Sequence, residues 1–242
     1  NSDFSYLLSV NPFPILQNHF TIISDTHCRQ TITELRLRDM AYMARLLEGY
    51  LVFFNGACSG ASAPDHFHFQ AVPVNAVPLT QWEEDVKNSL GVQHGEANDV
   101  KIDYSRSDNC NILCWKSPEG LRWWVVNRRR HRPWQYEAET DEKVLISPAA
   151  LEFAGVVPLA RKEDFEKMDA NLLRDIYLQC WNREPFVEVG IGTNLEATAN
   201  ADGTHSVDGV RIGIGFHWDQ KRRFRYEGQM LSRKDPTTGE SW

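Results

Sequence analysis

The sequence predicts an α+β domain followed by a β-rich tail, and three observations support this fold class. β-Prone runs in the first half of the chain enclose one stretch of clear helical periodicity. Two strand-like runs in the middle of the chain flank a Ser-Pro-Glu-Gly turn and predict a hairpin. The composition then becomes glycine-rich and β-prone. We therefore expect one domain over residues 1–183, and a β-rich extension or the start of a second domain over 184–242.

The first elements alternate strand, helix and strand. Residues 11–16 form an extended stretch fixed by two prolines, and residues 20–23 have strand composition. Residues 32–49 carry apolar side chains at helical spacing, with Gly49 placed to end the helix. Residues 50–54 then predict a buried strand that stops at a turn signal.

The later elements are a hairpin, two helices and the tail strands. Residues 109–115 and 121–127 form the hairpin. Residues 147–150 open a short helix, and residues 164–180 predict one amphipathic helix that begins with acidic side chains. In the tail, β-prone runs alternate around Asp202-Gly203 and predict short hairpins.

Charge and cysteine usage limit the class of protein. A net charge of −7 and a pI near 5.6 argue against general nucleic-acid binding, so a phosphate site has to be local. We expect no membrane association, because there is no long apolar run and no signal-peptide layout at the N-terminus. An odd, irregularly spaced set of cysteines predicts a reducing compartment, and we expect the cytoplasm. They are Cys28, Cys58, Cys110, Cys114 and Cys180.

The most informative segment is residues 65–70 (DHFHFQ), in which polar and apolar side chains alternate. On a strand, period two places His66, His68 and Gln70 on one face and the two phenylalanines on the other. A neutral imidazole is a nucleophile, and the small-residue loop before the segment lets backbone N–H groups approach an anion. Taken alone, the His-x-His pair fits a polar patch, a metal pair or a nucleophile.

Residues 55–70 resemble the signature of the histidine-triad and galactose-1-phosphate uridylyltransferase superfamily. An asparagine and a glycine precede a small-residue loop and then alternating histidines, with Gln70 in the third position. That glutamine is typical of the transferase branch, which includes diadenosine tetraphosphate phosphorylase and GDP-L-galactose phosphorylase. Residues 11–23 and the basic segment 128–133 also look like parts of this family. The resemblance implies a HIT-like antiparallel sheet with flanking helices.

The resemblance also implies roles for individual residues. His68 would be the nucleophile that forms a nucleotidyl-histidine intermediate, supported by His66, while Gln70 would hydrogen-bond the phosphate. Among the substrate-binding residues, Asn55 would help position the site. Gly60 and Ser62 belong to the loop, where the serine would contact phosphate oxygens.

The basic run 128–132 admits two interpretations. Four arginines after a strand can form a solvated turn. Beside a phosphate-handling motif, bidentate capture of a phosphate by one or two of them is the better interpretation, and we assign Arg130 and His131 to substrate binding.

The resulting functional prediction is a nucleotidyltransferase or phosphorylase acting on a nucleoside diphosphate sugar or a dinucleoside polyphosphate. Phosphate or a sugar phosphate would be the acceptor. A hydrolase of the same fold and a catalytically silent nucleotide-binding module remain as alternatives, and a homodimer is left open. No cofactor is expected. No zinc is expected either, because the Cys110–Cys114 spacing does not match the paired cysteines of the uridylyltransferase zinc site.

Overall fold

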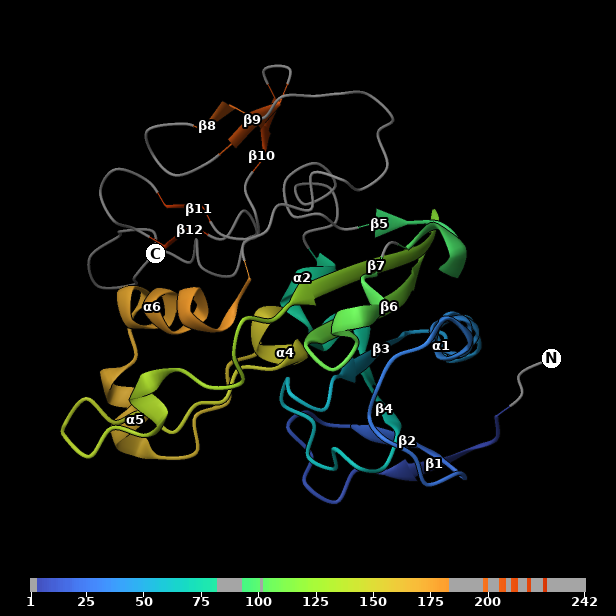
Figure 1. The fold of residues 1–242 in the computed structure, drawn as a ribbon, viewed down its shortest axis with the longest axis horizontal. Helices are drawn as coiled ribbons and strands as arrows, with labels where there is room; N and C mark the ends of the chain where they lie inside the picture. The colour runs from blue at the N-terminus through green and yellow to red at the C-terminus, as the bar shows by residue number, and fades with distance from the viewer. Residues whose placement is uncertain are drawn as a thin grey trace.

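A seven-stranded antiparallel sheet forms the centre of the protein (Figure 1). The computed structural model describes residues 4–81, 93–100 and 102–182, together with five short strands between residues 198 and 225. The strand order is β1-β2-β4-β3-β6-β7-β5. In chain order the strands are β1 (Tyr6–Val10), β2 (Phe20–Ser24), β3 (Tyr50–Asn55), β4 (His68–Pro73), β5 (Gln93–His94), β6 (Cys110–Ser117) and β7 (Gly120–Asn127).

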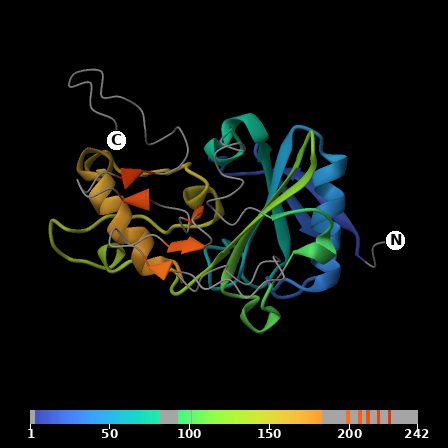
Figure 2. The same ribbon diagram turned by 90° about the horizontal axis from the view of Figure 1, so that it is seen from above.

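Helices lie on both faces of this sheet, as the view from above shows (Figure 2). The α-helices of the described residues are α1 (Glu34–Leu46), α2 (Pro78–Gln81), α4 (Ala150–Phe153), α5 (Lys162–Lys167) and α6 (Ala170–Cys180). Short 3-10 turns cover Val74–Ala76, Ala97–Asp99, Tyr104–Arg106 and Trp134–Tyr136. The predicted α+β fold, an antiparallel sheet with flanking helices, is confirmed.

Helix α1 covers one face of the sheet. Thr33 caps its first turn by accepting a hydrogen bond from the Arg36 N–H, and Gly49 (φ 81°) follows its end in the left-handed region. Its apolar side packs on a core that includes Phe54, Phe67 and Phe69, all fully buried. This agrees with the helix predicted over residues 32–49.

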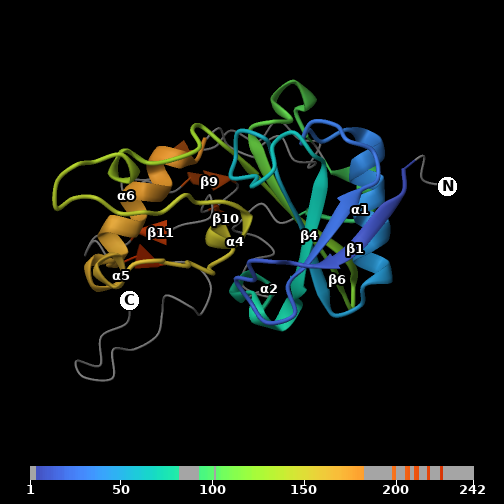
Figure 3. The same ribbon diagram turned by 90° about the horizontal axis from the view of Figure 1, so that it is seen from below.

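The opposite face is covered only in part. Helices α4 and α6 pack over the side chains of β3, β6 and β7, including Leu51, Leu113 and Trp124. Figure 3 shows both helices on the side of the sheet away from α1. Of the described helices, none packs over His68 and Gln70 of β4 or over the neighbouring β2 strand, and a pocket lies there.

The predicted helix over residues 164–180 is wrong in one respect, because the chain forms two helices. Met168 is extended (φ −71°, ψ 116°) and ends α5. The Asp169 side chain then accepts a hydrogen bond from the Leu172 N–H and starts α6. The aspartate therefore acts as a cap between two helices.

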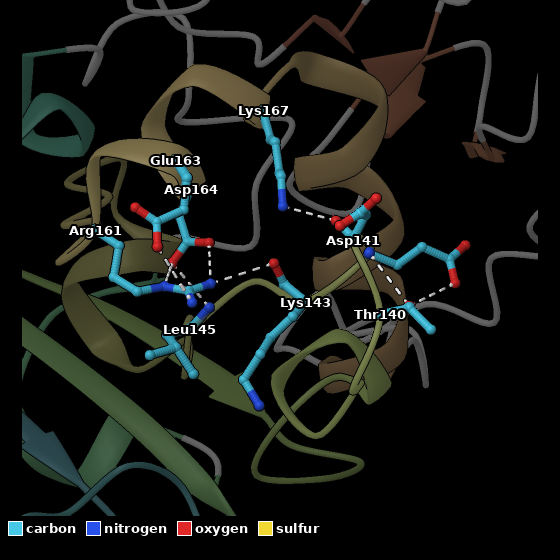
Figure 4. Close-up of polar contacts among 9 residues, drawn as sticks. Thr140, Asp141, Lys143, Leu145, Arg161, Glu163, Asp164 and Lys167 are labelled. Carbon is cyan, nitrogen blue, oxygen red and sulfur yellow. Dashed lines mark hydrogen bonds and ion pairs between the residues drawn. The ribbon is translucent and has the colours of Figure 1, made fainter.

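A polar network holds the segment before α4 against α5 (Figure 4). The Asp164 carboxylate, which has no exposed side-chain surface, accepts hydrogen bonds from Arg161 and from the Leu145 N–H. Arg161 also donates to the Lys143 carbonyl, and Lys167 donates to the Asp141 carbonyl. These bonds fix the path of the chain toward Ser147 and α4, which line the pocket.

The tail contains β8 (Thr198–Ala199), β9 (His205–Val207), β10 (Val210–Ile212), β11 (His217–Trp218) and β12 (Phe224–Arg225). Strands β8 to β10 form a three-stranded antiparallel sheet and β11 pairs with β12, in agreement with the predicted β-rich tail. The predicted boundary near residue 184 and the run 187–192 lie outside the described residues.

Candidate active site

A pocket of about 690 Å³ lies on the sheet face opposite α1. Its floor is formed by β2, β3 and β4, and its walls by the β1–β2 loop, residues 60–63, residues 131–132 and the start of α4. Of the residues predicted from the sequence, all but Arg130 line it: Asn55, Gly60, Ser62, His66, His68, Gln70 and His131.

His68 is held as a neutral imidazole with one defined tautomer. Its Nδ1 lies 2.9 Å from the carbonyl oxygen of His66. Because a carbonyl only accepts, Nδ1 carries the proton, and Nε2 keeps its lone pair. Burial lowers the pKa of His68, so the ring stays uncharged at neutral pH. His68 therefore presents an unprotonated, potentially nucleophilic nitrogen from the floor of the pocket.

His66 is oriented by the neighbouring strand. Its Nε2 donates to the Ser24 carbonyl at 2.9 Å, and its ring meets the His27 ring edge-on with centroids 5.0 Å apart. Asp65 pairs with His27 at 3.3 Å and is not among the pocket residues. The carboxylate next to the histidine motif is thus directed to the exposed His27.

Gln70 has its amide orientation fixed by two residues of the loop between β1 and β2. The Ile15 N–H donates to His19 Nδ1, so His19 Nε2 carries the proton and donates to Gln70 Oε1 at 2.8 Å. Asn11 donates to the same oxygen at 3.2 Å, while its own oxygen accepts from the Phe13 N–H. The Gln70 NH₂ group is thereby turned away from these partners and is available to a ligand.

His19 and Asn11 were not predicted as site residues. The resemblance covers residues 11–23 only as a segment and assigns no role to either residue. The pairing of β2 with β4, which places Thr21 opposite Gln70, brings them to the motif. Their separation from Gln70 by more than fifty residues leaves no local signal.

Asn55 is positioned by a buried network. Its Oδ1 accepts from Asn111 at 2.8 Å and from the Ala150 N–H at 3.0 Å, and Asn111 in turn accepts from Arg128 at 2.7 Å. Arg128 is 1% exposed and also lies over the Phe153 ring. With its oxygen occupied, Asn55 directs its NH₂ group toward the pocket that it lines.

The loop of residues 60–63 supplies backbone donors. Gly60 has φ +95°, and an added Cβ would lie 2.7 Å from the Ala149 Cβ, so glycine is required. Within the described part of the chain, the N–H groups of residues 60–63 donate to no backbone or side-chain acceptor. Together with the Ser62 hydroxyl they can bind an anion.

The basic run divides into buried and exposed members. The Arg130 side chain is exposed and outside the pocket, and its carbonyl accepts from Arg128. His131 and Arg132 line the pocket, with Arg132 stacked on the Tyr136 ring at 4.0 Å. Burial lowers the pKa of His131. Arg132 is therefore the arginine of this run that can reach a ligand.

Glu152 is a carboxylate that sequence reasoning did not select. It lines the pocket at the start of α4 and accepts from the Ala149 N–H at 2.9 Å. Burial raises its pKa to about 7. Its protonation thus changes close to neutral pH.

The described residues contain no cluster of three or more His, Cys, Asp or Glu side chains that could hold a metal ion. Cys110 and Cys114 are buried in the core beneath α1, where burial raises the pKa of both thiols. The zinc prediction remains open to experiment. No helix of the described part is both long and apolar enough to cross a membrane.

The antiparallel sheet and its flanking helices form an α+β fold of the HIT-like type. Solved structures share this fold. The structure of yeast Ap4A phosphorylase Apa2 in complex with AMP aligns with a TM-score of 0.52 and 20% identity over 75% of each chain. Its complex with Ap4A gives a TM-score of 0.50 and 19% identity over 73% of each chain. The family model described as "Domain of unknown function (DUF4922)" matches residues 1–73. No curated protein matches the chain.

Proposed function

We propose that this protein is a nucleotidyltransferase or phosphorylase that works through a covalent nucleotidyl-His68 intermediate. The single observation that carries the proposal is the hydrogen bond from His68 Nδ1 to the His66 carbonyl. It leaves Nε2 unprotonated in a pocket that also offers amide, hydroxyl and backbone N–H donors. A dinucleoside polyphosphate or a nucleoside diphosphate sugar is the proposed donor.

The first step forms a bond from His68 Nε2 to the α-phosphorus and breaks the bond from that phosphorus to the bridging oxygen. The leaving group departs with this oxygen as a nucleotide or sugar phosphate. The NH₂ groups of Gln70 and Asn55 and the N–H groups of residues 60–63 would stabilise the charge on the phosphoryl oxygens.

In the second step an oxygen of the acceptor attacks the same phosphorus. The N–P bond breaks, His68 returns to its starting state, and the nucleotide leaves extended by the acceptor phosphate. Arg132 and His131 line the pocket and are the proposed acceptor-side donors. The yeast phosphorylase with the same fold has been solved with Ap4A and with AMP, which supports a nucleotide ligand here.

Covalent labelling tests the proposal. The protein is incubated with α-³²P-labelled dinucleoside polyphosphates and nucleoside diphosphate sugars, with and without phosphate. We expect an acid-labile, base-stable adduct on the wild type, none on His68→Ala and reduced labelling on His66→Ala. Phosphate should discharge the adduct.

The remaining outcomes separate the alternatives. Discharge by water at the same rate as by phosphate would indicate a hydrolase. Binding of AMP without labelling by any donor would contradict the covalent mechanism and favour a nucleotide-binding module.

A further inference from the structure

Gln30 occupies an unusual place between two paired strands. The β3–β4 pairing runs from Tyr50 opposite Pro73 to Phe53 opposite Gln70. Continuing the same register would place Asn55 directly opposite His68, but no pairing occurs there. The side-chain amide of Gln30 lies at this position instead.

The amide makes three hydrogen bonds to the two strand ends. The His68 N–H donates to Gln30 Oε1 at 2.7 Å. Gln30 Nε2 donates to the His68 carbonyl at 2.7 Å and to the Asn55 carbonyl at 3.0 Å. Both amide hydrogens and the oxygen are therefore used, and the residue is completely buried.

The backbone of Gln30 is anchored as firmly as its side chain. Its N–H donates to the Pro64 carbonyl and its carbonyl accepts from the Ala57 N–H, both at 3.0 Å. These two residues belong to the loop that leads from β3 to β4. Gln30 therefore joins this loop, the end of β3 and the start of β4.

We propose that Gln30 is the positioning residue of this site, which keeps the ends of β3 and β4 apart and fixes the backbone of His68. Directly paired residues in neighbouring strands have Cβ atoms about 5 Å apart, too close to admit a phosphoryl group between their side chains. An amide inserted between the strands widens that gap. It also satisfies the backbone N–H and carbonyl groups that lose their partners where the two strands separate. It also fixes the position of the His66–His68 backbone, and therefore the position of the His68 imidazole in the pocket.

This inference rests on the proposed role of His68, and its experiment has a readout that does not. Gln30→Met keeps a similar shape but removes all three hydrogen bonds. We expect a roughly 100-fold slower labelling of His68, as a misplacement of about 1 Å produces, with AMP affinity changed only a few-fold. The kcat of turnover should fall while KM stays close to the wild-type value.

Gln135→Met is the matched control for stability. Gln135 is also buried, and its amide donates to Asp175 at 2.5 Å and accepts from Gln179 at 2.9 Å, outside the pocket. Both variants should lower the midpoint of thermal unfolding, but only Gln30→Met should slow labelling. Equal labelling rates in the two variants would overturn the positioning role.

Gln30→Glu provides a second test through pH. Its ionised carboxylate still accepts from the His68 N–H but faces the carbonyl oxygens of His68 and Asn55 without a hydrogen to donate. Protonation restores one donor. Labelling relative to the wild type should therefore recover as pH falls, and an unchanged ratio at all pH values would contradict the proposal.

The ¹⁵N chemical shifts of the His68 ring distinguish failure of this inference from failure of the proposed function. The wild-type ring should show a protonated Nδ1 and an unprotonated Nε2, and Gln30→Met should mix the tautomers. If the wild type is never labelled but the shifts change in this way, the positioning role stands and the transferase function fails. Unchanged shifts in Gln30→Met would overturn the positioning role.

Discussion

Around β4, consecutive side chains alternate between two very different environments. On one face Phe67 and Phe69 are completely buried beneath α1, with ring centroids 4.9 Å apart. On the other face His68 and Gln70 line the pocket. The first face is buried and apolar. The second face carries hydrogen-bonding side chains, and their hydrogen-bond partners fix the orientation of the amide and the imidazole.

The difference shows how one strand supplies both core and site. Since side chains alternate along a strand, a shift of one residue in register would place the histidines under α1 and the phenylalanines in the pocket. Packing of the aromatic core therefore fixes the strand register. The register in turn directs the histidine and glutamine side chains into the pocket. Substitutions on the two faces should consequently affect different properties.

Phe69→Ala should have the largest effect on stability. Removing this buried ring leaves a cavity beneath α1 and should lower the free energy of unfolding by about 3–5 kcal/mol. His68→Ala, one residue away, should change it by less than about 1 kcal/mol while abolishing labelling. Urea unfolding measures both, and equal losses would show that the faces are not functionally separate.

Glu152→Gln should alter the pH dependence of stability. Burial raises the folded-state pKa of Glu152 to about 7, above its ordinary value near 4.5. The folded protein therefore binds the proton more tightly, and stability should fall as pH rises between these values, by up to about 3 kcal/mol. The glutamine variant should lack this decline in urea unfolding at pH 5 and pH 8. A parallel decline in both proteins would assign it to other groups.

Asp164→Asn tests the support of the pocket wall. A hydrogen bond from Arg161 is the main cause that holds the pKa of Asp164 below its ordinary value. Its stabilising contribution is thus present at neutral pH and lost as pH falls through the folded-state pKa. We expect a loss of about 2 kcal/mol at pH 7. The difference from the wild type should shrink below pH ~4, and a constant difference would contradict the charge-based explanation.

Arg132→Ala should produce the smallest effect, on the acceptor side of the pocket. Loss of one charge-assisted hydrogen bond should slow discharge of the labelled enzyme by phosphate about 10-fold. Arg130→Ala serves as its control, because that side chain is exposed outside the pocket. A larger effect from Arg130→Ala would restore the original sequence-based assignment.

Local patterns in the sequence determined much of the fold and the identity of the motif. The alternation around His68, the spacing in α1 and the β6–β7 hairpin depend on neighbouring residues, so they can be predicted without tertiary contacts. The break at Met168 could not be predicted in the same way, because an aspartate cap resembles an ordinary polar helix position.

Tertiary structure alone decided which distant groups hold the motif in place. Gln30, His19 and Asn111 reach His68, Gln70 and Asn55 through strand pairing and loop packing across long stretches of sequence. Likewise, the path of the chain after β7 determines that Arg132 lines the pocket and Arg130 does not. Hydrogen bonds between side chains depend on distances and directions in space, which residue type and local period do not specify.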